Sequence, residues 1–107
     1  MTHNVILTAS AEHDLLDLHL FVELHDSPAR ADSFLTKIEQ KILSLGQMPQ
    51  RGHHPPELAR LGIHDFREIH CKPYRIIYEI MDTDVVIHAV IDGRRDIRDL
   101  LAARLLR

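Results

Sequence analysis

Apolar and polar residues alternate through the second half of the chain, from Phe66 to Asp96. Successive side chains of a β-strand point to opposite faces of the sheet, so a period of two indicates strands. In residues 74–80 and 84–92 one set of alternate positions carries no charge: Tyr74, Ile76, Tyr78, Ile80, Val85, Ile87, Ala89 and Ile91. A two-residue turn at 82–83 would place these residues opposite one another. Together with residues 66–71, the pattern predicts three antiparallel strands with one core-facing side.

The other side of these predicted strands is mixed in character. If Lys72-Pro73 forms the tip of the first hairpin, Ile69 and Cys71 join the apolar side, and Arg67 shares their parity near the outer end. The opposite side then collects Phe66, Glu68, His70, Arg75, Ile77, Glu79, Val86, His88 and Val90. We interpret this side as an open working surface.

Helices are predicted before and after this region in the chain. After a short strand at Asn4 to Leu7, Thr8 is a suitable N-cap for a helix that runs to about His25. Ser27-Pro28 starts a second helix, which Gly46 ends. Asp96 can cap a C-terminal helix that runs through Leu106. The apolar stripes of the first two helices comprise Ala11, Leu15, Leu18, Val22, Ala31, Phe34, Leu35, Ile38, Ile42 and Leu45.

The predicted fold class is therefore α+β. An antiparallel sheet with an N-terminal strand carries a two-helix hairpin on one face and a short C-terminal helix, in a single domain spanning residues 1–107. A second stripe on the first helix, Leu16, Leu20 and Leu24, lies almost opposite the first stripe. The favoured interpretation is that this helix is buried between the sheet and the second helix, and the alternative is a partner-binding surface.

Composition narrows the classes of function. A formal net charge of −3 excludes a polycation that wraps nucleic acid. No segment approaches the roughly 18 apolar residues that span a membrane, and nothing requires an oxidising compartment, so we expect a cytoplasmic protein. The lone Cys71 is expected to be a small buried hydrophobe.

The chain lacks a catalytic triad, a phosphate-binding glycine loop and paired cysteine ligands. His53-His54 lie in the long connection at 47–63, and no other ligand stands at a zinc-site spacing from them, so no metal and no other cofactor is expected. What remains is a set of arginines: Arg67, Arg75, Arg94 and Arg95. Each alone is most simply an ion pair with Glu68, Glu79, Asp92 or Asp96. Together they indicate an acidic partner or a phosphodiester backbone.

Four motifs in the order strand, helix, helix and three strands resemble the ParE/RelE superfamily, the toxins of type II toxin-antitoxin systems. They are PEL at 56–58, FREI at 66–69, PYRIIYEI at 73–80 and DGRRD at 92–96, and the resemblance covers nearly the whole chain. It implies a plasmid stabilisation protein that is neutralised by a cognate antitoxin. The activity is either ParE-like poisoning of DNA gyrase or RelE-like ribosome-dependent mRNA cleavage. A non-toxic protein-binding module of the same fold is a further alternative.

The resemblance assigns roles for the nuclease alternative. Arg75 matches a strand arginine used on the phosphate, Arg95 a basic residue at the final turn, and Glu57 a carboxylate used as base in one subgroup. His70 and His88 would be the best acid and base. Because the C-terminal helix has no Tyr or His and the chain is not strongly basic, we favour DNA gyrase as the target over the ribosome and mRNA.

A gyrase poison needs no acid or base, only a surface that binds its target. The residues predicted to bind partners are Arg67, Arg75, Ile77, Val86, His88, Val90, Arg94, Arg95 and Arg98. The antitoxin is expected to contribute an acidic, amphipathic segment that folds as it binds. A homodimer and a toxin–antitoxin hetero-oligomer both remain open.

Overall fold

A computed structural model describes residues 2–95 and 97–105 of the chain. Its strands are β1 (Asn4–Leu7), β2 (Phe66–Cys71), β3 (Tyr74–Met81) and β4 (Asp84–Asp92). Its helices are α1 (Ala9–His25), α2 (Pro28–Ser44), the 3-10 helix η1 (Pro49–Arg51), α3 (Pro56–Ala59) and α4 (Arg98–Leu105). The α+β class is confirmed. None of the described helices is long and apolar enough to cross a membrane.

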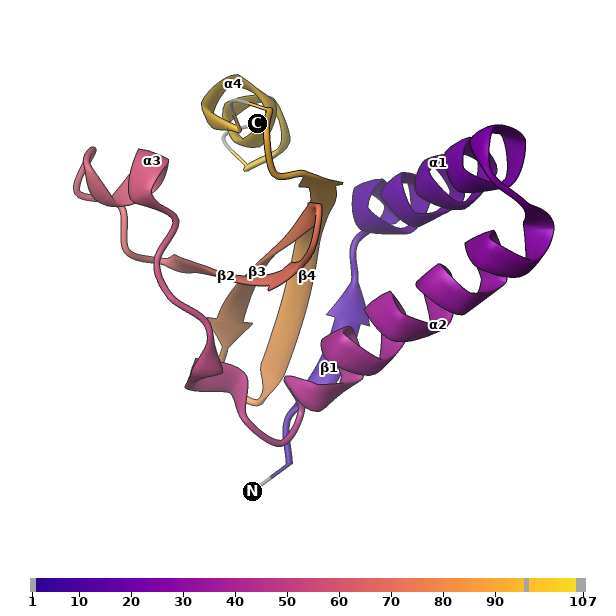
Figure 1. Ribbon diagram of the computed structural model, residues 1–107. Coiled ribbons are helices and arrows are strands. Elements are labelled where there is room, and N and C mark those ends of the chain that lie inside the picture. The colour runs from indigo at the N-terminus through magenta and orange to yellow at the C-terminus, as the bar shows by residue number, and fades with distance from the viewer. Residues whose placement is uncertain (1, 96, 106–107) are drawn as a thin grey trace.

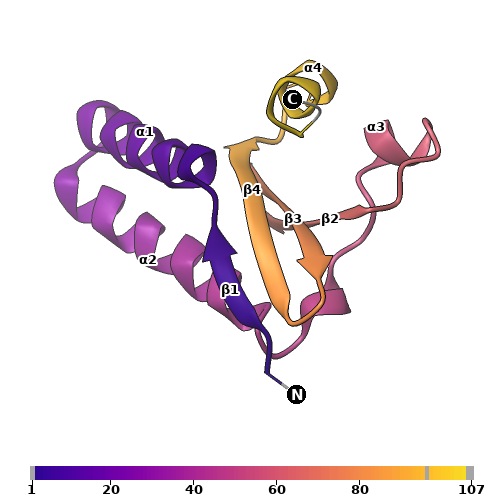
Figure 2. The ribbon, with the colours of Figure 1, turned by 180° about the vertical axis from the view of Figure 1, so that it is seen from behind.

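The four strands form one sheet in the order β1-β4-β3-β2. Helices α1 and α2 lie on one side of this sheet, and α3 and α4 lie on the other (Figure 1). The meander from β2 to β4 is antiparallel, as predicted. Strand β1, however, runs parallel to β4, beside which it lies in Figure 2, so the sheet is mixed. Alternation in a four-residue strand shows which side chains share a face but carries no information about strand direction.

Local sequence signals set the helix boundaries. The Thr8 hydroxyl accepts a hydrogen bond from the backbone N–H of Ala11, and the Ser27 hydroxyl accepts one from Arg30, each at 3.1 Å. Both N-caps are therefore confirmed. Helices α1 and α2 form a hairpin that packs on the sheet. The core between them comprises Ala11, Leu18, Ile38, Ile42, Leu45, Ile69, Cys71, Ile76, Tyr78, Val85, Ile87 and Val90. Cys71 is buried, as predicted.

The β3–β4 pairing departs from prediction half-way along. The register holds from Met81↔Asp84 to Tyr78↔Ile87, after which Ile77 pairs with Ala89 because His88 is an extra residue in β4. Beyond this β-bulge every side chain of β4 changes face. The predicted inward positions of Ala89 and Ile91 are therefore wrong, and Val90, predicted to be open, points into the helix-side core.

Two charged side chains support the bulge. Asp14 of α1 accepts a hydrogen bond from the Val90 N–H at 3.0 Å, and Arg104 of α4 donates to the His88 carbonyl at 3.2 Å. Arg104 also donates hydrogen bonds to both carboxylate oxygens of Asp14, at 2.6 and 2.8 Å. A bulge interrupts the ladder of backbone hydrogen bonds, and these side chains replace what it loses.

The sheet face predicted to be open carries a second core. Its buried members are Leu58, Ile77, Ala89, Ile91, Ile97 and Leu101. Ile97, just before α4, and Leu101 of α4 cover this face, so the prediction that Ile77 lies on an open surface is wrong. The alternation identified two faces correctly but gave no sign that both would be covered.

The second leucine stripe of α1 is exposed. Leu16, Leu20 and Leu24 are 69%, 54% and 73% exposed, and the neighbouring Phe21 is 54% exposed. The favoured interpretation, burial between the sheet and the second helix, is therefore wrong. Helices α1 and α2 lie side by side over the sheet, and the stripe lies on the side of α1 that faces away from the sheet (Figure 1).

Candidate functional site

The most highly connected charged side chain on the sheet is Arg75 of β3. It donates to Glu57 through Nη1 at 2.7 Å and Nη2 at 2.9 Å. It donates to Glu68 through Nε at 2.9 Å and Nη2 at 2.6 Å. Four of its five N–H donors therefore bind carboxylates in two bidentate pairs. Arg75 is 8% exposed and Glu68 only 1%.

Three separate elements bring this cluster together. Arg75 lies on β3, opposite His70 of β2. Glu68 lies two residues before His70 on β2, and Glu57 lies in the first turn of α3. Gly93, just after β4, leaves room for the arginine stem. A Cβ there would lie 3.2 Å from Arg75 Cγ and 3.1 Å from the Pro73 carbonyl oxygen.

The charges of the cluster stabilise one another. Burial alone would raise the pKa of Glu68, but hydrogen bonds from Arg75 and His70 outweigh it and lower the pKa below the usual 4.5. The hydrogen bonds with Glu57, opposed by burial and supported by Glu68, raise the pKa of Arg75. Both shifts favour the ionised forms of Glu68 and Arg75.

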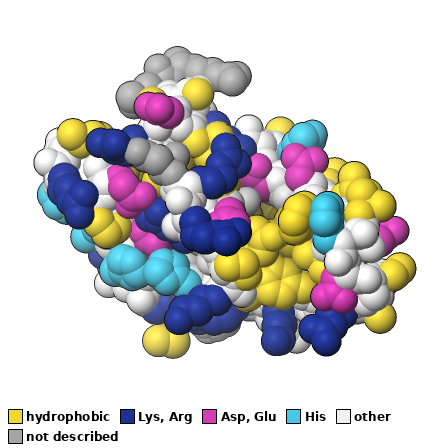
Figure 3. Space-filling model, turned by 45° about the horizontal axis from the view of Figure 1, so that its top comes forward, with side chains coloured by type: hydrophobic (Ala, Val, Ile, Leu, Met, Phe, Trp, Pro, Cys, Tyr) yellow, Lys and Arg dark blue, Asp and Glu magenta, His cyan; other side chains and the backbone are white. Residues whose placement is uncertain are grey.

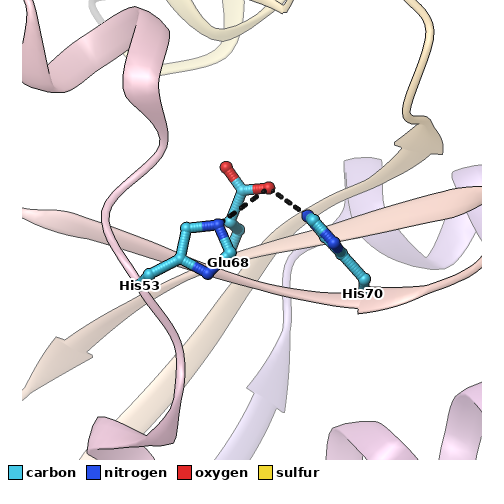
Figure 4. A group of neighbouring side chains, drawn as sticks. All are labelled: His53, Glu68 and His70. Atoms are coloured by element: carbon cyan, nitrogen blue, oxygen red, sulfur yellow. Dashed lines mark hydrogen bonds and ion pairs between the residues drawn. The ribbon is translucent and has the colours of Figure 1, made fainter.

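The 47–63 connection lies against the edge of β2 and brings His53 close to Glu68. His53 forms an antiparallel bridge with Glu68, whose N–H donates to the His53 carbonyl at 2.7 Å. Gly52 permits the close approach, because a Cβ there would lie 2.6 Å from the Glu68 carbonyl oxygen. His53 and His70 both face the Glu68 carboxylate (Figure 4).

Tyr78 fastens this connection to the sheet. Its fully buried hydroxyl donates to the Pro49 carbonyl at 2.6 Å and accepts from the Gly52 N–H at 3.0 Å. We expect Tyr78→Phe to lower the free energy of unfolding by about 1–3 kcal/mol, because both backbone groups lose their partner. Urea denaturation measures this loss. Tyr74→Phe is the matched control, since within the described chain its hydroxyl makes no hydrogen bond, and an equal loss there would contradict the assignment.

Other predicted site residues lie elsewhere. Arg67 donates to the Gly52 carbonyl at 2.8 Å, so it supports the connection without pairing with a carboxylate. His88 bonds Glu79 at 3.0 Å and packs its ring against Phe66, with ring centroids 5.6 Å apart.

The basic turn after β4 is exposed. Arg94 pairs with Asp92 at 2.8 Å, and this hydrogen bonding lowers the pKa of Asp92 to about 2. Arg95 and Arg98 are exposed as well, and Asp96, the predicted cap of the last helix, lies outside the described residues. The predicted arginine set is thus split between a buried network and an exposed turn. Val86 is half-buried.

A family model described as the ParE toxin of the type II toxin-antitoxin system, parDE, matches residues 5–97. The chain belongs to this family. The match includes Glu57, Glu68 and Arg75 and ends at the start of the C-terminal segment. No curated protein sequence matches the chain.

Solved structures of similar fold agree with this ParE-family assignment. The chromosomal ParDE system of P. aeruginosa matches with a TM-score of 0.72 and 15% identity, over 85% of this chain and 96% of that one. The RelBE2 toxin-antitoxin complex of Mycobacterium tuberculosis matches with a TM-score of 0.62 and 24% identity, over 86% and 99%. A mutant of the E. coli toxin RelE in the free state matches with a TM-score of 0.65 and 12% identity, over 100% and 98%. These likenesses show the shared ParE/RelE fold.

Proposed function

We propose that this ParE-family toxin arrests growth by binding DNA gyrase, and that it does not cleave mRNA. The observation that carries the proposal is the engagement of Arg75 by Glu57 and Glu68. An arginine that stabilises a cleaved phosphodiester must direct its donors at the phosphate. Four donors of Arg75 are already bonded, and two carboxylates would repel an incoming phosphate.

The separation of the two candidate histidines supports the same conclusion. His88 packs on Phe66 at one end of β2, whereas His70 lies four residues further along that strand. Four residues of strand span about 13 Å, too far for an acid and a base to act on one phosphodiester. The face in Figure 3 interleaves Lys and Arg with Asp, Glu and His around a hydrophobic area, and so it lacks a continuous basic surface for RNA.

A cognate antitoxin is the partner that we propose for the exposed stripe of α1, formed by Leu16, Leu20, Phe21 and Leu24. Contiguous apolar surface of this kind marks a protein-binding site. The adjoining groove is lined by Glu12, Leu15, Leu16, His19, Leu35 and Glu39. Its acidic rim calls for Lys or Arg beside the apolar residues of the antitoxin segment. We therefore propose a basic amphipathic segment in place of the acidic one, because the acidic expectation rested on an open sheet face with a cationic rim.

Growth measurements test toxicity and target together. Expression of the chain alone should arrest growth, and co-expression of the neighbouring reading frame should relieve the arrest. Plasmid DNA from arrested cells should be less negatively supercoiled than in controls, while mRNA stays intact. Cleaved mRNA with normal supercoiling would contradict the proposal, and unimpaired growth would leave only the non-toxic binding module.

Charges introduced into the exposed stripe of α1 test the antitoxin surface. The double variant Leu16→Glu/Leu20→Glu should still arrest growth but should no longer be relieved by the antitoxin. Leu43→Glu is the matched control, because Leu43 is an exposed leucine of α2 outside the stripe. Full relief of the double variant would contradict this surface. The remaining alternative is that the stripe forms the interface of a homodimer. Size-exclusion chromatography of the chain alone tests this, because the double variant would then elute as a monomer.

A further inference from the structure

Three side chains at the edge of β2 have the composition of a metal centre: His53, Glu68 and His70. We propose that they form a binding site for a divalent transition-metal ion of the zinc class. Their ligand atoms, two imidazole nitrogens and one carboxylate oxygen, all lie within 4.8 Å of one another. Two histidines and one glutamate are a recurrent three-ligand set for zinc sites that keep one coordination position open.

The present distances are close to those of a tetrahedral site. His70 Nε2 lies 2.6 Å and His53 Nε2 lies 3.7 Å from Glu68 Oε1 (Figure 4). Metal–ligand bonds of about 2.0–2.1 Å in a tetrahedron place ligand atoms about 3.3–3.4 Å apart. Each separation would therefore have to change by at most about 1.5 Å to seat the ion, which is within reach of side-chain rotation. His53 is 59% and His70 46% exposed, so both rings can move.

The surroundings hold the ligands in place. The backbone bridge between His53 and Glu68 fixes the loop ligand beside the strand ligand. Arg75 bonds both oxygens of Glu68, at 2.9 and 2.6 Å, and so orients the carboxylate. Ligating carboxylates are commonly oriented by such outer hydrogen bonds.

The three ligands share a pocket that is open to solvent. This pocket has a volume of about 350 Å³ and is also lined by Glu57, Lys72 and Arg75. A fourth coordination position on the ion would therefore face the pocket.

Sequence spacing did not suggest this site. His53 stands far from Glu68 and His70 along the chain, and its neighbour His54 bonds the Phe66 carbonyl instead. The β-bridge of the 47–63 connection alone brings the ligands together. The inference is independent of the toxin's target.

The test uses the tag-free full chain with Co²⁺ and Zn²⁺ as probes. Co²⁺ should give the visible absorption of a four-coordinate ion, and Zn²⁺ should compete for the site and raise Tm, since a ligand of the folded state stabilises it. His53→Ala and His70→Ala should each weaken Co²⁺ binding by more than the roughly 10–100-fold caused by losing an outer supporting residue. Melting without metal verifies that both variants fold.

His19→Ala is the matched control, because His19 also lies between carboxylates, 2.8 Å from Asp32 and 3.6 Å from Glu23. It should bind Co²⁺ as the wild type does. Only six-coordinate Co²⁺ spectra, binding by folded His53→Ala within a few-fold of wild type, or loss of binding in His19→Ala would each overturn the site.

Discussion

Replacing Arg75 by methionine should lower the free energy of unfolding by about 3–5 kcal/mol at neutral pH, as expected when one partner of a buried ion pair is removed. Methionine keeps most of the stem's packing but leaves Glu68, 1% exposed, and Glu57 as neighbouring carboxylates with no cation between them. Urea denaturation of the two proteins measures the difference.

Arg94→Met is the control for this substitution. Arg94 also pairs with a carboxylate, Asp92, but its side chain is 85% exposed, and exposed pairs contribute little. Its unfolding midpoint should stay near that of wild type. Similar midpoints for Arg75→Met and Arg94→Met would contradict a structural role for Arg75. The double variant Arg75→Met/Glu68→Leu should recover stability relative to Arg75→Met, since it removes an uncompensated buried charge.

The ionised Glu68 carboxylate should stabilise the wild-type protein but destabilise Arg75→Met, so its effect on stability should change with pH in opposite directions in the two proteins. In wild type the pKa of Glu68 is lowered, so its stabilising contribution is complete above 4.5 and is lost as pH falls through the folded-state value. In the variant, burial without the cation raises this pKa, so the destabilisation is greatest at neutral pH and diminishes toward 4.5. Denaturation at pH 7 and near pH 4.5 should show the gap narrowing. A gap that stays constant would show that Glu68 does not carry the charge.

Ile87→Ala should cost about 2–5 kcal/mol, the range for truncating a fully buried isoleucine in a core that cannot collapse around the cavity. Ile87 of β4 is 0% exposed and pairs with Leu7 of β1 and Tyr78 of β3, so a neighbouring strand flanks it on each side. Equilibrium urea denaturation at neutral pH gives the value.

Neighbouring valines supply the controls for the register. Val86 is half-buried and lies on the opposite face. Val86→Ala should therefore lower the free energy of unfolding much less than Ile87→Ala does. Val90 lies at an even offset from Val86 but is only 3% exposed, because the bulge turns it into the core. Val90→Ala should therefore cost more than Val86→Ala. Equal losses for the two valines would contradict the bulge.

Most of the architecture could be predicted because its signals are local. Period-two alternation located β3 and β4, and Thr8 and Ser27-Pro28 marked the starts of α1 and α2. The bulge could not be predicted, because it depends on Asp14 and Arg104 meeting β4 from distant parts of the chain. The same limit applies to the second core, since nothing local placed the C-terminal helix over Ile77.

The candidate site was predictable only in part. Arg75 and Glu68 share a parity on adjacent predicted strands, so their pairing was among the ion pairs considered. That Glu57 closes the network from α3 depended on how the long connection folds, which carries no periodicity. For the exposed stripe of α1 the residues could be predicted but their burial could not. Leu16, Leu20 and Leu24 were recognisable as a face, but the sequence did not say whether this chain or another protein covers it.

We propose that Arg75 maintains the structure of this ParE-family toxin and that the toxin acts by binding gyrase. The most direct measurement adds the purified protein to gyrase with relaxed plasmid and ATP, and in parallel to translating ribosomes with mRNA. We expect that supercoiling is inhibited while the mRNA stays whole. Ribosome-dependent cuts in the mRNA that disappear in His88→Ala or in folded Arg75→Met, together with unimpaired supercoiling, would contradict it.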